Sequence, residues 1–302
     1  MSKPKVIAIV GPTASGKTAL SITLAQKFNG EVISADSRQV YRGLDLGTGK
    51  VTTEEMADVP HHLLDIVDPK TDTYTGADFV RDASTAVADI SSRGHLPIIA
   101  GGTFFYLDLL RGLRSSAPVP PNETLRAELE QKSTEELSAE LTRLDPRRAS
   151  TIDHANRRRL IRALEVINTL GHVPETTVAD SPYDMFILGI DVPVDTLNER
   201  IYKRIIDRIE QGMIEETNTL HESGVSWERM ASFGLEYRSI GSYLQGHLTK
   251  DAMIEELAAK TRQFAKRQRL WLKHDKSIIW LPFPVDTDKA VATVQTFLHS
   301  QH

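Results

Sequence analysis

The clearest chemical signal in the chain is a glycine-bracketed stretch near the N-terminus. The phosphate-loop pattern G-x-x-x-x-G-K-[ST] is matched in full by Gly11, Pro12, Thr13, Ala14, Ser15, Gly16, Lys17 and Thr18. In such a loop the backbone N–H groups converge on phosphate oxygens, and the positive N-terminal end of the following helix adds to the attraction. The pattern predicts that Lys17 reaches the outer phosphate and that the Thr18 hydroxyl holds Mg²⁺. We therefore expect the chain to bind a di- or triphosphate.

A phosphate loop does not by itself show that a phosphoryl group is transferred. NTPases usually hold their Mg²⁺ with a second carboxylate at the end of a neighbouring apolar strand. The apolar run 97–101 leads into Gly101-Gly102-Thr103, which carries no acid. Asp65, which follows His-His-Leu-Leu, is the alternative, and the sequence does not show that it lies beside the loop.

Asp36 is a second candidate for chemistry because it closes the strand expected over 31–36. In an open α/β sheet the carboxyl ends of the strands line the ligand crevice, so a carboxylate there can bind Mg²⁺ or act as a general base. The structural alternative is that Asp36-Ser37 caps the next segment. The position of Asp36 at the expected rim of the crevice favours the functional interpretation.

The elements that must position these residues follow an α/β pattern. The helix expected over 19–28 has Leu20, Leu24 and Phe28 at four-residue spacing, and Asn29-Gly30 ends it. Short apolar runs of the kind found in buried parallel strands predict strands over 5–10, 31–36, 63–67, 97–101, 186–192 and 277–283. The predicted fold is a P-loop NTPase-like, doubly wound parallel sheet.

Two loop-like segments interrupt this rhythm, the proline-rich stretch 115–121 and the stretch 173–184. We expect an α/β core at 1–114 and 185–302 and a mainly helical insertion domain at 115–184. In the insertion, residues 122–145 hold seven acids against three bases, whereas residues 146–172 hold six arginines against two acids. This asymmetry indicates a partner surface, with a solvated helix face as the alternative.

Composition narrows the classes of site and partner. The 302 residues include no cysteine, which excludes disulfides, thiolate metal sites and a cysteine nucleophile. No apolar stretch approaches the roughly 18 residues of a membrane span, and the N-terminus has no signal-peptide pattern, so we expect a cytoplasmic protein without a membrane partner. The net charge of −5 means that a nucleic-acid partner requires local basic patches.

Candidate basic patches occur in the insertion and near the C-terminus. The expected start of an insertion helix carries Arg157, Arg158, Arg159 and Arg162. The helix expected over 252–274 carries a stripe at spacings of four, three and four, made of Arg262, Lys266, Arg269 and Lys273. The lack of intervening acids in this stripe favours contact with phosphates over a solvated face. On another face, Leu257, Phe264 and Trp271 recur every seven residues and are expected in the core.

A third basic row is expected on a helix that begins near Thr196 and Glu199, which are spaced as a capping box. Arg200, Arg204 and Arg208 share one face of this helix. Pairing with the helix's own acids Asp207 and Glu210 is the alternative for Arg200 and Arg208.

Six segments, in order along nearly the whole chain, resemble those of bacterial tRNA dimethylallyltransferases. They are GPTASGKT (11–18), DSRQVY (36–41), GTGK (47–50), PHHLLD (60–65), GGTFFY (101–106) and RRLIRALEV (158–166). The combination is far more specific than the phosphate loop alone. One stretch departs from the pattern: the family's G-Y-R-[QE] appears here as Glu236-Tyr237-Arg238-Ser239.

The resemblance implies an enzyme that binds dimethylallyl diphosphate in the phosphate loop, with Mg²⁺ as cofactor. The dimethylallyl group would pass to N6 of adenosine 37 beside the anticodon of tRNA, and diphosphate would leave. The resemblance implies that Asp36 is the general base and that Thr103 lies close to the reactive amine. It also implies that Lys17 and Arg204 bind the diphosphate and that the protein is a monomer.

We expect contact with the anticodon stem-loop from the basic patches and from positions that the resemblance supplies. These residues are Asp36, Ser37, Arg38, Gln39, Thr103, Arg126, Arg158, Arg159, Leu160, Ile161, Arg162, Tyr237, Arg238, Arg262, Lys266 and Arg269.

Two other functions fit part of the sequence. A small-molecule kinase would use the loop for ATP and Asp36 to deprotonate a hydroxyl acceptor, but it does not need arginine clusters in an insertion. A non-catalytic, nucleotide-gated RNA-binding protein would explain the basic patches and leave Asp36 and Thr103 without a role. Asp36→Ala separates this binder from the enzymes, because only an enzyme has turnover to lose.

Overall fold

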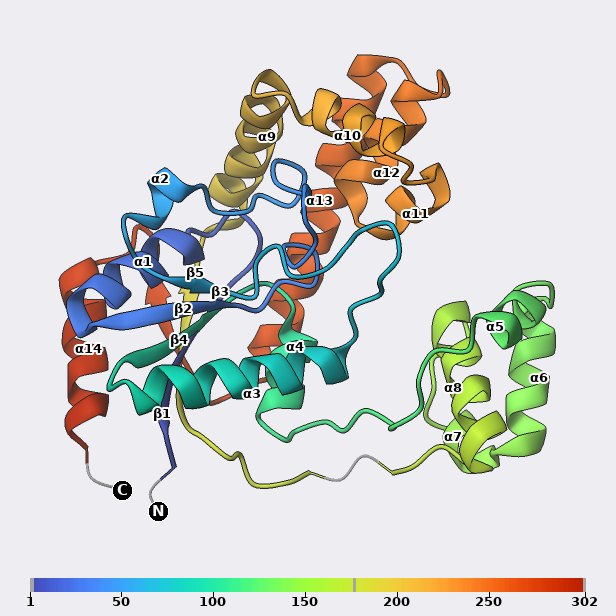
Figure 1. The fold of residues 1–302 in the computed structure, drawn as a ribbon, viewed down its shortest axis with the longest axis horizontal. Coiled ribbons are helices and arrows are strands. Elements are labelled where there is room, and N and C mark those ends of the chain that lie inside the picture. The colour runs from blue at the N-terminus through green and yellow to red at the C-terminus, as the bar shows by residue number, and fades with distance from the viewer. Residues whose placement is uncertain (1–2, 176–177, 301–302) are drawn as a thin grey trace. The chain divides into compact units, whose positions relative to one another are not determined.

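The computed structural model describes residues 3–175 and 178–300. The chain divides into two compact units, one made of Met1–Arg111 with Asp180–His302 and the other of Gly112–Ala179. The first unit contains a six-stranded sheet with helices on both faces, and the second is helical (Figure 1).

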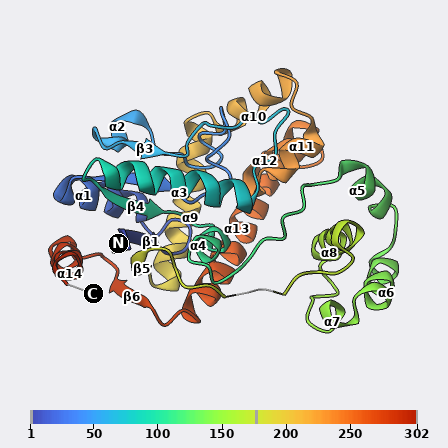
Figure 2. The same ribbon diagram turned by 60° about the horizontal axis from the view of Figure 1, so that its bottom comes forward.

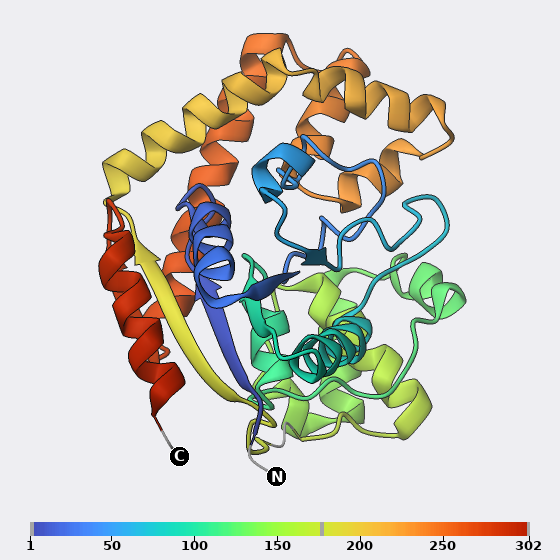
Figure 3. The same cartoon turned by 60° about the vertical axis from the view of Figure 1, so that its left-hand side comes forward.

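All neighbouring strands of the sheet are parallel, in the order β3-β2-β4-β1-β5-β6. The strands are β1 (Lys5–Val10), β2 (Gly30–Ser34), β3 (His61–His62), β4 (Leu96–Ala100), β5 (Asp184–Asp191) and β6 (Ile278–Pro282). This confirms the expected doubly wound parallel class. In Figure 3 the arrowhead of β5 points toward α9 (Val194–Glu210), which lies at the carboxyl ends of the strands.

One predicted strand is wrong. The run 63–67 is apolar enough for a strand, but β3 consists of His61–His62 alone. Leu63 and Asp65 have φ values of 63° and 56°, and these left-handed conformations interrupt an extended chain. Val67 makes only an isolated bridge with Tyr41.

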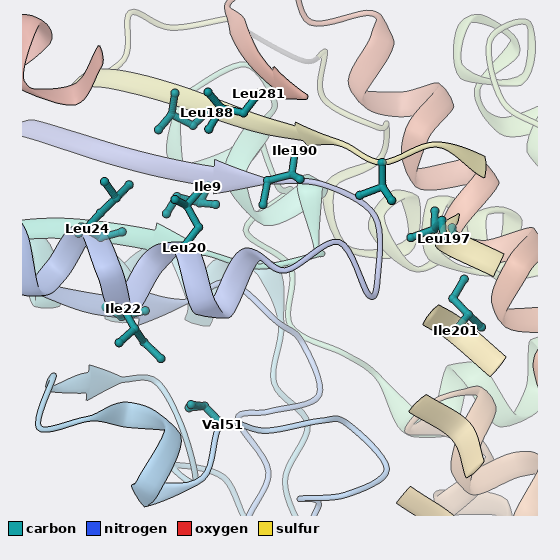
Figure 4. Packing of buried hydrophobic residues seen from close by; sticks show 14 of the residues in the cluster. Ile9, Leu20, Ile22, Leu24, Val51, Leu188, Ile190, Leu197, Ile201 and Leu281 are labelled. Carbon is teal, nitrogen blue, oxygen red and sulfur yellow. The ribbon is translucent and has the colours of Figure 1, made fainter. Parts of the chain in front are cut away.

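Alternate residues of β1 face two helical layers. Ile7 and Ile9 lie in the cluster formed with α1 (Lys17–Phe28) and α14 (Thr287–His299). Figure 4 shows Leu20 and Leu24 of α1 directed toward Ile9. Val6 belongs to the cluster formed with α3 (Gly76–Ser92) on the opposite face of the sheet. Burying each large aliphatic side chain stabilises the fold by about 1.5–3 kcal/mol, and together they fix where β1 delivers the phosphate loop.

The remaining helices of this unit are α2, α4 and α9 to α13. Their bounds are α2 (Thr53–Met56), α4 (Phe104–Leu110), α10 (Met213–Glu222), α11 (Trp227–Ser232), α12 (Leu235–Leu244) and α13 (Lys250–Lys273). The capping box expected at Thr196 and Glu199 is wrong, because α9 begins at Val194 after Pro193 and no side chain caps it. Proline suits this position because it has no N–H to leave unpaired.

Of the row Leu257, Phe264 and Trp271, which is expected in the core, only the first residue is buried. Leu257 is fully buried, whereas Phe264 and Trp271 are 40% and 37% exposed. A strict seven-residue repeat drifts by about 20° per heptad around a straight α-helix, so a row that starts in the core turns away from it.

Arg269 of the basic stripe donates to the Val192 carbonyl at 2.8 Å and pairs with Asp191 at 3.2 Å.

Outside residues 176–177, which the structure does not describe, the unit Gly112–Ala179 holds four helices around a small core; Figure 2 shows their arrangement. They are α5 (Glu123–Leu129), α6 (Thr134–Leu144), α7 (Pro146–Ala149) and α8 (Arg157–Leu170). Glu165 of α8 is completely buried, accepts a hydrogen bond from the Asn122 backbone N–H at 2.6 Å and pairs with Arg126 and Arg162. Because a buried carboxylate needs such partners, these two arginines also hold the unit together.

A second buried carboxylate, Glu31 of β2, anchors the edge of the sheet. Its side chain is 2% exposed and bonds to Arg93, to His62 Nε2 at 2.7 Å and to His95 Nδ1 at 3.0 Å. Hydrogen bonds from Arg93, the largest effect, and from His62 outweigh burial and lower the pKa of Glu31 to about 2.

We expect Glu31→Gln to lower the free energy of unfolding by about 2 kcal/mol at neutral pH, because three charged or polar partners lose their carboxylate. A depressed pKa stabilises the folded state above the ordinary glutamate pKa and loses this effect as the pH falls toward 2. The difference between the two proteins should therefore shrink below about pH 4.5. Denaturant titrations across this range check it, with the exposed Glu255→Gln as control; a difference independent of pH would contradict the assignment.

Candidate active site

The phosphate loop follows β1 and leads directly into α1. Gly16 has φ of 101°, a left-handed value that favours glycine, and no side chain caps the first turn of α1. The N–H groups of this turn are therefore available to a ligand, and an anion is the ligand that a helix N-terminus attracts. Thr18, the second residue of α1, is exposed.

Lys17 lies folded back on the loop, where its ammonium donates to the carbonyls of Gly11 at 3.0 Å and Pro12 at 2.8 Å. Burial, with a smaller contribution from Arg204, lowers the pKa of Lys17 to about 7, and Asp36 acts in the opposite direction. The Lys17 residue as a whole is half-buried. An anion in the loop would favour the charged form.

The arginine row on α9 runs beside the loop. Its members precede Ile201, Ile205 and Ile209, which are buried in the main core, so the row borders the core-facing stripe of the helix. Two members reach the loop: Arg200 Nε donates to the Ala14 carbonyl at 2.8 Å, and Arg204 Nη2 donates to the Thr13 hydroxyl.

Arg204 and Arg208 lie in largely buried surroundings. The Nε atom of Arg204 is buried and has no hydrogen-bond partner in the described part of the chain. Burial lowers the pKa of Arg204 to about 9. Arg208 packs against Gly49, where a Cβ atom would lie 1.7 Å from Nη2. Within residues 3–175 and 178–300, neither Asp207 nor Glu210 pairs with this row, and Asp207 pairs with Lys203 instead.

Asp36 and Thr103 lie next to each other because the carboxyl ends of β2 and β4 are joined. The Thr103 N–H donates to the Ala35 carbonyl, and the Ser37 N–H donates to the Thr103 hydroxyl, both at 3.1 Å. Gly101 permits this approach, since a Cβ there would lie 2.2 Å from the Ala35 carbonyl oxygen. Asp36 Oδ1 accepts from the Arg38 N–H at 2.9 Å, which closes a side-chain turn and occupies one carboxylate oxygen, while no helix begins here for Asp36 to cap.

Gln268 of α13 was not found from the sequence. It is 5% exposed, accepts from the Thr13 N–H at 2.8 Å and donates to the Gly102 carbonyl at 3.0 Å. It therefore ties the phosphate loop to the turn that carries Thr103. No sequence pattern marks a glutamine within a basic stripe, and its partners are far away along the chain.

Glu216 of α10 was also not found from the sequence. Its carboxylate accepts from the N–H groups of Asp45, Leu46 and Gly47 and from the Tyr237 hydroxyl at 2.7 Å. Tyr237 is 1% exposed and fits against Gly47, where a Cβ would lie 2.4 Å from the phenol ring. These contacts shape the loop 44–50.

Gln39 holds the same loop from the other side. It donates to the Gly49 carbonyl at 3.1 Å and accepts from the Ser34 hydroxyl at 2.9 Å. Asp65, the alternative metal carboxylate, pairs with Lys50 at 2.5 Å. Among the described residues no group of three or more histidine and acidic side chains could hold a metal.

The residues expected at tRNA differ in exposure. In the insertion unit, Arg158 and Arg159 are exposed, whereas Leu160 and Ile161 lie in the core. In the sheet-containing unit, Arg238 is exposed and donates to the Ala231 carbonyl. The side chains of Arg262 and Arg269 are partly exposed, that of Lys266 is exposed, and those of Ser37 and Arg38 are half-buried. No described helix is long and apolar enough to cross a membrane.

Comparisons of the sequence with a family profile and with known proteins agree on one family. The sequence profile of the family described as IPP transferase matches residues 39–275. The chain is 41% identical to tRNA dimethylallyltransferase 1 of Trichlorobacter lovleyi, over 98% of this chain and 99% of that protein. It is 44% identical to tRNA dimethylallyltransferase of Thermomicrobium roseum, over 93% and 87% of the two chains.

Solved structures agree with the sequence matches. The tRNA isopentenylpyrophosphate transferase of Bacillus halodurans superposes with a TM-score of 0.73 at 37% identity, covering 98% of this chain and 96% of that one. A eukaryotic dimethylallyltransferase acting on tRNA superposes with a TM-score of 0.84 at 29% identity, covering 98% and 79%.

We expect Gln268→Leu to weaken binding of inorganic diphosphate about tenfold and to cost about 2 kcal/mol of stability, because a buried N–H and a buried carbonyl lose their partner. Calorimetric titration and denaturant unfolding measure the two effects. Gln263→Leu, an exposed position on the same helix, is the matched control. A loss of stability with unchanged diphosphate affinity would mean that Gln268 does not position the loop.

Proposed function

The chain belongs to the IPP transferase family, and we propose that it is a tRNA dimethylallyltransferase. It transfers the dimethylallyl group from dimethylallyl diphosphate to N6 of adenosine 37, beside the anticodon of tRNA, and releases diphosphate. The observation that carries the proposal is the meeting of a phosphate loop with Asp36 and Thr103 at the carboxyl ends of three adjacent strands. A cradle for a leaving group thus adjoins a carboxylate for the acceptor.

The phosphate loop suits diphosphate as a leaving group. Breaking the allylic C–O bond builds negative charge on the oxygen that leaves. Free N–H groups of the first turn of α1, the Lys17 ammonium and the Arg204 guanidinium stabilise that charge more strongly than they stabilise the substrate. No phosphoryl group moves, so a second strand-end carboxylate for hydrolysis is not required.

Asp36 suits the acceptor half of the reaction. The exocyclic amine of adenine is a weak nucleophile because its lone pair is delocalised into the ring, so removal of a proton as N6 attacks assists the reaction. One Asp36 oxygen is held by the Arg38 N–H, which orients the carboxylate. The Thr103 hydroxyl already has Ser37 as its neighbour and lies beside the place where the amine would enter.

The site also fits Mg²⁺ bound together with the substrate. Mg²⁺ takes oxygen ligands and commonly uses few protein groups plus substrate phosphates. The exposed Thr18 hydroxyl in the first turn of α1 is such a donor, and the absence of a three-ligand cage among the described residues agrees with a metal that arrives with diphosphate. Bound Mg²⁺ would neutralise charge on the diphosphate oxygens.

The acceptor base must leave its stack to reach this crevice, as in other enzymes that act on bases. Basic residues that attract the anticodon stem-loop are part of the proposal, with Arg158 and Arg159 exposed on α8 and Lys266 exposed on α13. We also propose that the protein works as a monomer in the cytoplasm, where its tRNA substrate is found.

The direct test uses labelled dimethylallyl diphosphate, Mg²⁺ and an unmodified anticodon stem-loop, beside the same loop with guanosine in place of the target adenosine. We expect label on RNA only when the adenosine is present. If no label appears and ATP is consumed with a small-molecule acceptor, a kinase replaces this proposal.

In that assay we expect Asp36→Asn to reduce turnover by about 10²–10⁴-fold, the contribution of a general base. Binding of the stem-loop should stay nearly unchanged, because asparagine retains the shape and the bond to the Arg38 N–H. Asp58→Asn, an exposed residue, is the control. Retained turnover in Asp36→Asn would defeat the general-base role.

We expect Arg158→Ala combined with Arg159→Ala to weaken tRNA binding and to make its salt dependence shallower, because fewer counterions are released. Binding of inorganic diphosphate should not change. Both side chains are exposed and carry no hydrogen bond or ion pair among the described residues, so the fold is spared. Arg143→Ala, an exposed arginine of α6, is the control, and unchanged tRNA affinity in the double variant would mean that this face of α8 meets only solvent.

A further inference from the structure

Arg208 of α9 is a cation in largely buried surroundings that the described chain leaves without a partner. In residues 3–175 and 178–300 its guanidinium makes no hydrogen bond and no ion pair. Asp207, the preceding residue, pairs with Lys203 instead. Because desolvation of a charge is costly, buried charges normally have partners, and an unpaired guanidinium indicates that an anion completes the site.

The position of Arg208 follows from the arginine row of α9. Arg204 Nη2 donates to the Thr13 hydroxyl, so the row lies beside the phosphate loop at this point. Residues four apart lie on one face of a helix and about 6 Å apart along its axis, which puts Arg208 one turn beyond Arg204. The long arginine side chain spans such a distance, so both guanidinium groups can reach one diphosphate in the loop.

The Arg208 guanidinium has its seat on Gly49 of the loop 44–50. A Cβ atom on Gly49 would lie 1.7 Å from Nη2, 2.6 Å from Cζ and 3.1 Å from Nη1 of Arg208, so the guanidinium lies directly against the glycine backbone. Gly49 also has φ of 65°, a left-handed value that favours glycine. Packing thus fixes the position of the guanidinium without using its N–H donors.

The loop that provides this seat is itself held in place. Glu216 accepts hydrogen bonds from three of its N–H groups, and Gln39 donates to the Gly49 carbonyl at 3.1 Å. Because Gln39 follows Asp36 by three residues, the seat adjoins the segment that carries the candidate base. A guanidinium on this seat therefore has a fixed place near the segment where the acceptor chemistry is proposed.

We propose that Arg208 is a further diphosphate-binding residue, whose guanidinium is presented to the leaving group by its seat on Gly49. This inference rests on the proposed function, because it assumes that diphosphate occupies the phosphate loop. A guanidinium offers N–H donors in one plane and matches phosphate oxygens in pairs. Negative charge on the diphosphate increases as the allylic C–O bond breaks, so a cation beside Arg204 stabilises the leaving group more than the substrate.

The test measures the affinity of inorganic diphosphate, in the presence of Mg²⁺, for the intact protein and for Arg208→Gln by calorimetric titration. The matched control is Lys203→Gln, because Lys203 is an exposed cation on the same helix and its replacement removes the same charge. We expect Arg208→Gln to weaken binding about tenfold to a hundredfold, the effect of losing one charge-assisted hydrogen bond. Lys203→Gln should change it less than about twofold, because solvent and salt screen an exposed charge.

Gly49→Ala tests the seat, since the added Cβ must displace the Arg208 guanidinium. Its control is Gly246→Ala: Gly246 has φ of 77°, and among the described residues nothing beyond its chain neighbours lies within 4 Å of the added Cβ. We expect Gly49→Ala to weaken diphosphate binding and Gly246→Ala to leave it unchanged. The double variant Gly49→Ala with Arg208→Gln should bind no more weakly than Arg208→Gln alone, because both changes remove one contact.

Thermal unfolding verifies that each variant is folded, and Arg208→Gln decides alone if Gly49→Ala does not fold. Diphosphate affinity of Arg208→Gln equal to that of the unaltered protein overturns the binding role. Unchanged diphosphate affinity with weaker binding of the anticodon stem-loop overturns it as well, and assigns Arg208 to an RNA phosphate. Additive losses in the double variant overturn the seat on Gly49.

The proposed function fails in a different measurement. If the unaltered protein binds diphosphate and Arg208→Gln binds it more weakly, but no labelled dimethylallyl group reaches the stem-loop, the transfer reaction is wrong and the role of Arg208 stands. If the unaltered protein does not bind diphosphate at all, both are overturned.

Discussion

Burial of the cations Lys17, Arg204 and Arg208 is the constraint on which the candidate site depends. Burial lowers the pKa of each of them, so their charged forms are held at a cost in free energy. The buried isoleucines of α9 and the strands of the sheet contribute the hydrophobic free energy that offsets this cost. A bound anion would favour the charged form of each cation, which is why we expect the site to prefer a highly charged ligand.

The second constraint is that Asp36, the carboxylate proposed to act on the acceptor, must lie close to these cations without forming an ion pair with them. Two hydrogen bonds between the ends of β2 and β4 meet this constraint: the Thr103 N–H donates to the Ala35 carbonyl, and the Ser37 N–H donates to the Thr103 hydroxyl. The Asp36 carboxylate, beside these bonds, is oriented by a main-chain group, the Arg38 N–H, at 2.9 Å. A carboxylate oriented in this way retains an oxygen for a substrate proton, as a general base requires.

The sequence predicts the parts of the fold and the site whose signals are local. The phosphate loop, its strand and its helix occupy adjacent residues, and the structure has them where the pattern indicates. The strand expected over 63–67 fails because composition does not reveal the left-handed φ values of Leu63 and Asp65. Gln268 could not be found, because its bond to Thr13 spans 255 residues of sequence. The carboxylate of Glu216 accepts hydrogen bonds from backbone N–H groups. Because every residue other than proline has such a group, the side-chain types of the partners do not reveal these bonds.

Some arginines of the unit Gly112–Ala179 are explained by packing within the unit, and others remain for a binding partner. Glu165 is buried with Arg126 and Arg162, so these arginines satisfy the acid before they can meet a phosphate. Arg157 pairs with Glu130, whose side chain is exposed, and also donates to the backbone carbonyls of Leu129 and Glu130. Arg158 and Arg159 differ because helical periodicity turns them from the core that Leu160 and Ile161 enter. The 3.6-residue period of the helix thus divides one run of arginines into two groups: those that pair within the unit and those that remain exposed for a polyanion. In this way a chain of net negative charge can present a basic face.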